Sequence, residues 1–131
     1  EFALFDMLIY SESDAGRLKN WPQVLENVRA EVAVIPQPAY NRFANSFGHI
    51  FAGGYSAGYY SYAWAEVLSA DAYAAFEKSG DLAATGARFL AEILSRGGSR
   101  GAAESFRAFR GRDATADALL RHLGLTGGEA A

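Results

Sequence analysis

A stretch of sixteen residues near the middle of the 131-residue chain concentrates side chains that could do chemistry. Between Phe47 and Tyr62 it holds one histidine, two adjacent glycines and four tyrosines. A tyrosine hydroxyl has a pKa of about 10, so it remains a hydrogen-bond donor at neutral pH. A row of such donors beside a glycine loop is suited to stabilising a developing oxyanion or to binding a peptide backbone.

The spacing of three tyrosines predicts that they share one face of a helix. Tyr55, Tyr59 and Tyr62 stand at i, i+4 and i+7, whereas Tyr60 points elsewhere. The competing interpretation is that they are core residues, as aromatic stripes at helical spacing usually are. Leucine or phenylalanine would suit a core better, because each buried phenol needs a hydrogen-bond partner. The spacing alone leaves both interpretations open.

The two histidines of the chain are weighed in the same way. His49 precedes the double glycine, where a lone histidine is more often a hydrogen-bonded structural residue than a catalyst. His122 lies in a leucine-rich segment and is interpreted as structural or solvated. Neither begins the HExxH motif of helical zinc sites, and they are far apart in the sequence. We therefore assign no metal ligand to this chain.

Composition bounds the class of protein. Half of the residues are apolar and 14% are aromatic, which favours a folded domain. Fifteen acidic residues outweigh twelve basic ones, and this balance argues against a nucleic-acid partner. Arg107, Arg110 and Arg112 are accordingly interpreted as a surface or interdomain salt-bridging face. The lack of cysteine excludes a disulfide scaffold. No apolar run approaches the roughly 20 residues of a membrane-spanning helix, so no membrane partner is expected.

Apolar periodicity and the positions of proline and glycine predict an all-α, multi-helical fold. Helices are expected over residues 1–12, from residue 20 to the prolines at 36 and 38, over 55–78, over 85–96, and in two short segments before Gly111 and Gly124. The expected N-caps are Asn20, Ser99 and either Asp113 or Thr115. A break is expected at 13–16. Residues 36–54 are expected to be irregular, with Gly53 and Gly54 in a mobile or tightly turned loop.

The chain opens inside an apolar pattern. Residues Glu1 to Tyr10 place apolar side chains at helical spacing with no capping residue before them, and the single methionine is Met7. This is typical of a helix cut part-way along, and it predicts that the chain is a fragment of a longer protein. The alternative is that residues introduced for expression precede the natural start.

The central stretch resembles a known family. Gly48 to Tyr55, continued by Tyr59 to Leu68, is similar to the zinc oligopeptidases of the thimet oligopeptidase family, and most of all to its bacterial oligopeptidases and peptidyl-dipeptidases. The same family pattern recurs at 1–10, 94–99, 109–112 and 117–120. Gly48 and Ala63 differ from the family pattern, but neither is one of the polar residues that carry the resemblance. The resemblance implies that residues 1–131 form the C-terminal part of the catalytic domain of a larger helical metallopeptidase.

The resemblance also implies a cofactor, partners and a location. The zinc-binding HExxH helix of the family lies upstream of this region, so zinc is expected in the full-length enzyme and none on the residues of this chain. Short peptides are the implied substrates, and the upstream part of the same enzyme is the implied partner. A cytoplasmic location follows from the same resemblance.

Site residues are carried over by position. The tyrosine matching Tyr62 donates a hydrogen bond to the oxyanion, which makes Tyr62 and His49 the implied catalytic residues. His49 and Tyr55 are implied to bind the substrate near the scissile bond, and Tyr59 to line the same pocket. Two glycines belong to the loop that lets the substrate-binding tyrosine reach the peptide: Gly53 and Gly54.

Three hypotheses follow. In the first, the chain is part of a zinc-dependent oligopeptidase, completes its site and is inactive alone. In the second, it is a stand-alone helical module that binds peptides without turnover. In the third, it is a structural piece whose exposed apolar faces would normally pack on missing sequence, so that it would self-associate in isolation.

Overall fold

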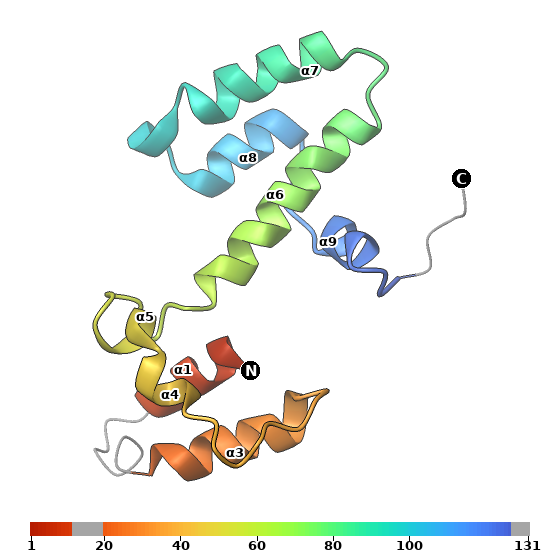
Figure 1. Ribbon diagram of the computed structural model, residues 1–131. Helices are drawn as coiled ribbons and strands as arrows, with labels where there is room; N and C mark the ends of the chain where they lie inside the picture. Colours follow the sequence, from red (N-terminus) through yellow and green to blue (C-terminus); the bar gives the residue numbers. More distant parts are fainter. Residues whose placement is uncertain (12–19, 127–131) are drawn as a thin grey trace. The chain divides into compact units, whose positions relative to one another are not determined.

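The computed structural model describes residues 1–11 and 20–126 (Figure 1). Its regular elements are all helical, and no strand occurs within those two ranges, which confirms the predicted all-α class. The chain divides into two compact units, Glu1–Tyr62 and Ala63–Ala131. The break expected at 13–16 lies outside the described residues.

The first unit is built from two longer helices and two short ones. They are α1 (Phe2–Tyr10), α3 (Trp21–Val32), α4 (Phe43–Ser46) and α5 (Gly48–Phe51). The buried side chains of its core come from all four: Phe5, Ile9, Leu25, Ala44, Phe47 and Ile50. As predicted, α3 begins directly after Asn20 with Pro22 in its first turn, although the Asn20 side chain makes no capping hydrogen bond.

Residues 36–54, expected to be irregular, contain the short helices α4 and α5. Phe43, Phe47 and Ile50 are spaced at i, i+4 and i+7. Phe47 and Ile50 are 5% and 0% exposed, and Phe43 packs against the same core. The prediction holds for residues 36–42 and 52–54 and is wrong for α4 and α5. It weighs the prolines and glycines of this stretch above three apolar residues whose burial stabilises two helical turns.

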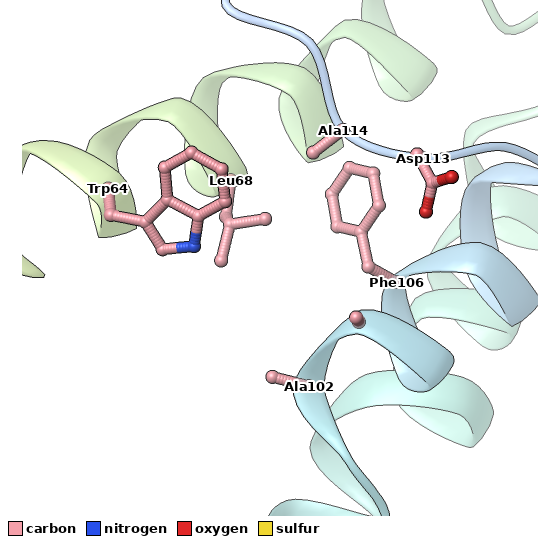
Figure 2. Close-up of a pocket in the computed structure, with 7 residues that line it drawn as sticks. Trp64, Leu68, Ala102, Phe106, Asp113 and Ala114 are labelled. Carbon is pink, nitrogen blue, oxygen red and sulfur yellow. The ribbon is translucent and has the colours of Figure 1, made fainter.

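The second unit contains the greater part of α6 (Ser61–Glu77) and the elements that follow it. These are α7 (Leu82–Phe89), a π-helical turn η1 (Leu90–Leu94), a 3₁₀ turn η2 (Gly97–Ser99), α8 (Ala102–Arg110) and α9 (Asp117–His122). The rings of Phe89 and Phe109 meet with their centroids 5.3 Å apart. Trp64 and Leu68 of α6 and Phe106 of α8 line an open hollow of about 270 Å³ (Figure 2).

Several predicted helix boundaries in this unit are wrong by a few residues. Helix α7 begins at Leu82 rather than at residue 85, because Asp81 Oδ1 accepts a hydrogen bond of 3.0 Å from the backbone N–H of Ala84. Gly101 and Ala116 precede α8 and α9. The residues expected to cap these two helices therefore do not: Ser99, Asp113 and Thr115.

A buried carboxylate joins α6 to the end of α8. Asp71 is 0% exposed, and its oxygen Oδ1 lies 3.1 Å from Arg110 Nη2 and 2.6 Å from Arg112 Nη2. Arg107 pairs separately with the exposed Asp113 at 2.7 Å. The predicted salt bridging is confirmed, and a surface position is confirmed for Arg107 and Arg112, whose side chains are 52% and 44% exposed. For Arg110 the predicted surface or interdomain face is wrong, because its side chain is 13% exposed and pairs with a buried carboxylate within the second unit. The sequence analysis did not single out that carboxylate.

Candidate functional site

Four of the predicted site residues converge in the first unit. The His49 ring lies with its centroid 6.0, 5.6 and 6.1 Å from the rings of Tyr55, Tyr59 and Tyr62. Tyr55 and Tyr62 stack at 5.3 Å, and Tyr59 meets Tyr62 at 5.0 Å. The structure therefore brings together one imidazole and three phenols, which we call the His–Tyr cluster.

A turn, rather than a helix, carries two of these tyrosines. Helix α6 begins only at Ser61, so the helix predicted over 55–78 is wrong in its first six positions. Ala57 has a φ of +54°, which a right-handed helix does not contain. The N–H of Tyr59 donates to a side chain instead of to a helical carbonyl. The helix face predicted for the three tyrosines does not exist, and their rings meet because the turn leads back toward α5.

The exposure of the His–Tyr cluster decides between a core and a surface role. Tyr55 and Tyr62 are 38% and 42% exposed, and His49 is exposed as well. Tyr59 is half-buried and packs edge-on against Phe47 of the core, with the centroids 4.9 Å apart. Within the described part of the chain, Tyr55 and Tyr62 are therefore not core residues. The interpretation as a core residue holds in part for Tyr59, whose ring joins the cluster to the core.

The Tyr62 hydroxyl is held in its protonated form. Side-chain hydrogen bonding with Tyr55 is the largest cause, and desolvation and the nearby phenols of Tyr55 and Tyr59 act in the same direction. Together they raise the pKa of Tyr62 above its ordinary value. A phenol with a raised pKa keeps its proton throughout the neutral range, so Tyr62 can donate a hydrogen bond to a developing negative charge.

The two glycines of the loop meet different steric requirements. A Cβ atom on Gly53 would lie 2.9 Å from the carbonyl oxygen of His49 and 3.0 Å from its Cα, both of them backbone atoms. Gly54 has open space around it but adopts a φ of +78°, where side chains are disfavoured. The loop thus leaves α5 so closely that only glycine fits at residue 53, and it turns in a way that favours glycine at residue 54.

Gly53→Ala is expected to loosen the loop, because backbone at 2.9 Å cannot give way without moving α5. Strain of this kind costs about 1–3 kcal/mol. We expect amide hydrogen exchange in residues 48–59 to become about 5- to 150-fold faster, as measured by mass spectrometry. Gly48→Ala is the matched control, since a Cβ there meets nothing within 4 Å. Equal exchange in the two variants would contradict the steric argument.

Two residues of α1 hold the loop, and the sequence analysis missed both. The Asp6 carboxylate accepts the N–H groups of Ala57 and Tyr59, each at 2.9 Å. The Tyr10 hydroxyl donates to the carbonyl oxygen of Ile50, also at 2.9 Å. Asp6 is the single charged residue inside the apolar run of residues 2–10. Such an isolated carboxylate is the signal that could have indicated a buried polar contact.

The site residues do not fit a metal centre. Zinc sites take three or four ligands from histidine, cysteine and carboxylate side chains. Within residues 1–11 and 20–126 no three such side chains gather, and the neighbours of His49 in the cluster are phenols.

His122 of the second unit instead lies with Nε2 3.2 Å from Glu77 Oε1, in keeping with its predicted structural role. None of the described helices is long and apolar enough to cross a bilayer.

Comparison with known proteins gives a consistent answer over almost the whole chain. Residues 1–125 match the family described as Peptidase family M3. The chain is 52% identical over 126 residues to oligopeptidase A of Haemophilus influenzae, covering 95% of this chain and 18% of that protein. It is 47% identical over 128 residues to oligopeptidase A of Escherichia coli, covering 97% and 19%. Dipeptidyl carboxypeptidase of Escherichia coli is 41% identical over 103 residues, covering 78% and 14%.

The chain thus spans less than a fifth of the length of these curated relatives. Its match to the family covers both units and includes the whole stretch from His49 to Tyr62. The resemblance that the sequence analysis based on that stretch is confirmed: the chain belongs to peptidase family M3.

Proposed function

We propose that this chain supplies the substrate-binding and oxyanion-stabilising residues of a metallo-oligopeptidase that hydrolyses short peptides. The observation that carries the proposal is the His–Tyr cluster, in which His49, Tyr55 and Tyr62 are exposed on the first unit of a chain that belongs to a peptidase family. The relatives named oligopeptidase A and dipeptidyl carboxypeptidase support peptides as the substrate class.

Tyr62 acts as the catalytic donor in this proposal. Attack on a peptide carbonyl places negative charge on the carbonyl oxygen, and a preorganised hydroxyl aimed at that oxygen stabilises it. The raised pKa of Tyr62 keeps the required proton in place, and a stacked contact with Tyr55 and a tilted contact with Tyr59 fix the ring. His49 and Tyr55, both exposed, bind the peptide near the scissile bond, and the half-buried Tyr59 forms the wall of the pocket.

The two glycines set the position of the loop. Gly53 lets the backbone pass close to His49, and Gly54 provides the turn that brings Tyr55 back to the cluster. We propose that zinc is held by residues outside this chain, since the described residues do not fit a zinc site. The cytoplasmic location and the lack of a nucleic-acid partner remain predictions.

Hydrolysis of an internally quenched peptide of about ten residues tests the proposal. The full-length protein should cleave it, and a metal chelator should abolish cleavage. The isolated 131-residue chain should show no turnover, with or without added zinc. Zinc-dependent turnover by the isolated chain would contradict the proposal that the zinc ligands lie outside this chain. Peptide binding by the isolated chain, together with a full-length protein that has no peptidase activity, would favour the stand-alone binding module.

The isolated chain offers apolar surface for self-association. In the first unit Val34 and Ile35 are 95% and 72% exposed, and in the second unit Leu94 is 61% exposed. Exposed apolar side chains that gather into a patch tend to find a partner. In the proposal the upstream part of the enzyme covers them. A sedimentation coefficient that rises with concentration for the isolated chain supports this arrangement, and a monomer at every concentration contradicts it.

A further inference from the structure

Helix α1 holds the loop of the His–Tyr cluster through two polar side chains. Asp6 and Tyr10 are four residues apart and therefore lie on one face of α1. Asp6 accepts the backbone N–H groups of Ala57 and Tyr59, and Tyr10 donates to the carbonyl oxygen of Ile50. The chain from Ile50 to Tyr59 is thus fixed to one helix at both of its ends.

Asp6 is the more unusual of these two side chains, because it is a carboxylate with 0% exposure. Burying a charge is costly unless hydrogen bonds or an opposite charge compensate it. Within the described residues, the hydrogen bonds to Asp6 come from backbone N–H groups of the loop and no ion pair reaches it. An apolar residue would be buried at this position at no such cost, so burial alone does not explain an aspartate here.

The two backbone N–H groups that Asp6 accepts explain why an aspartate stands at this position. In a helix running on from Tyr55, the N–H of Tyr59 would donate to the carbonyl oxygen of Tyr55. That carbonyl instead accepts the N–H of Gly58 at 2.8 Å, and the N–H of Tyr59 is taken by Asp6. Ala57 adopts a φ of +54° while its own N–H donates to the other carboxylate oxygen. Asp6 therefore competes directly with the helix that the spacing of the tyrosines favours.

The hydrogen bonds of Asp6 also affect where the tyrosine rings lie. The carbonyl oxygens of Gly58 and Tyr59 accept the N–H groups of Ser61 and Tyr62, at 3.0 and 3.2 Å. A change at Tyr59 is therefore transmitted to the first turn of α6. On the alternative helix, Tyr55 would leave the neighbourhood of His49, where its ring now lies 6.0 Å away.

We propose that Asp6 is a positioning residue of the peptidase site. By accepting the N–H groups of Ala57 and Tyr59, it holds residues 55–60 out of a helix and so gathers Tyr55, Tyr59 and Tyr62 around His49. The inference rests on the proposed function, because the arrangement that Asp6 maintains is the one assigned to peptide hydrolysis.

The test uses the full-length protein with two substitutions at this position. Asp6→Asn keeps the volume and one acceptor oxygen, whereas Asp6→Ala removes both acceptors. We expect Asp6→Asn to lower kcat on the quenched peptide about tenfold with KM changed less than threefold, and Asp6→Ala to lower kcat further. Amide exchange in residues 55–60 should become about tenfold faster in Asp6→Asn. Both are measured where circular dichroism shows a folded protein.

Asp81→Asn is the matched control. Asp81 also accepts a backbone N–H, that of Ala84, but it lies in the second unit. The Asp81→Asn substitution should leave kcat and the amide exchange of residues 55–60 unchanged. If Asp6→Ala fails to fold, Asp6→Asn decides alone. Unchanged exchange in Asp6→Asn overturns the proposal, and so does faster exchange with an unchanged kcat.

Failure of the proposed function is distinguished by assaying Tyr62→Phe in parallel. Loss of kcat in Tyr62→Phe but not in Asp6→Asn overturns only the role of Asp6. A Tyr62→Phe protein with full kcat overturns the assignment of the site, and with it the role of Asp6 in hydrolysis. The exchange measurement still decides whether Asp6 holds the loop, because it does not depend on activity.

Discussion

Tyr62→Phe in the full-length protein is expected to lower kcat for peptide hydrolysis by about 10²–10³ while the fold survives. The substitution removes one hydroxyl and keeps the ring, whose contacts with Tyr55 and Tyr59 at 5.3 and 5.0 Å do not need the oxygen. Tyr62 is 42% exposed, so its hydroxyl contributes little to the core. The loss should therefore appear in kcat from initial rates on the quenched peptide, with an unchanged circular dichroism spectrum.

Tyr60→Phe provides the matched control for this prediction. It likewise removes one phenol hydroxyl, but from a residue two positions away. The Tyr60 ring is 54% exposed and makes none of the ring contacts found among the described residues of the cluster. We expect kcat to stay within about twofold, as for other surface substitutions. A Tyr62→Phe enzyme that retains its kcat, or a Tyr60→Phe enzyme that loses as much, would remove the proposed role of Tyr62.

The pH dependence of the same variant follows from the direction of the pKa shift. The pKa of Tyr62 is raised by hydrogen bonding with Tyr55, by desolvation and by the neighbouring phenols, so the hydroxyl is protonated at every pH below about 10. The ratio of wild-type to Tyr62→Phe activity should therefore be constant from pH 6 to 9. A ratio that falls tenfold as the pH rises through this range would mean that Tyr62 ionises there and cannot be the donor assigned here.

The sequence predicts the helical class and most helix positions because their signals are local. Helix α3 follows from Asn20, Pro22 and the buried stripe of Leu25 and Val28, all within nine residues. The composition of the His–Tyr cluster is equally local, since imidazole, glycines and phenols stand together in the chain. Residue types of this kind indicate the chemistry of a site whatever path the backbone takes between them.

The path itself is not local. The turn at residues 55–60 depends on Asp6, which is separated from Ala57 and Tyr59 by 51 and 53 positions. Neither partner carries a signal that points to the other, because the acceptors are carboxylate oxygens and the donors are backbone N–H groups that every residue except proline possesses. Local spacing favours a helix there, and a tertiary hydrogen bond overrides it. The periodicity of the tyrosines consequently predicts that their rings gather, but for the wrong geometric reason.

Asp71 of the second unit shows the same kind of long-range control, and its loss is expected to be the most damaging to stability. Asp71→Ala should lower the free energy of unfolding of this unit by about 3–5 kcal/mol, as removal of one partner from a buried pair does. Most of the effect comes from Arg110, whose side chain is only 13% exposed and would be left without its carboxylate. The Arg112 side chain is 44% exposed and can be hydrated. Amide exchange in α8, read as an opening free energy, measures the loss.

The acid dependence of this stabilisation has a definite sign. Burial disfavours the charged form of Asp71, but hydrogen bonds from Arg112, from the N–H of Thr115 and from Arg110 outweigh it and lower the pKa of Asp71 below 3.8. A carboxylate with a lowered pKa in the folded state stabilises fully above its unfolded pKa of about 3.9, and the stabilisation is lost as the pH falls through the folded value. The exchange difference between wild type and Asp71→Ala should thus be constant above about pH 5 and should shrink at lower pH.

Asp113→Ala separates this buried pair from ordinary surface electrostatics. Asp113 also meets an arginine, Arg107, at 2.7 Å, but the two side chains are 77% and 52% exposed. Solvent screens such a pair, so its removal should leave exchange in α8 unchanged within error at every pH. Equal losses in the two variants would show that charge pairing in general, rather than the burial of one carboxylate beneath two arginines, holds the end of α8. A larger loss confined to Asp71→Ala would identify the buried carboxylate as the residue that fixes the segment from Arg110 to Thr115, because it accepts hydrogen bonds from both ends of that segment.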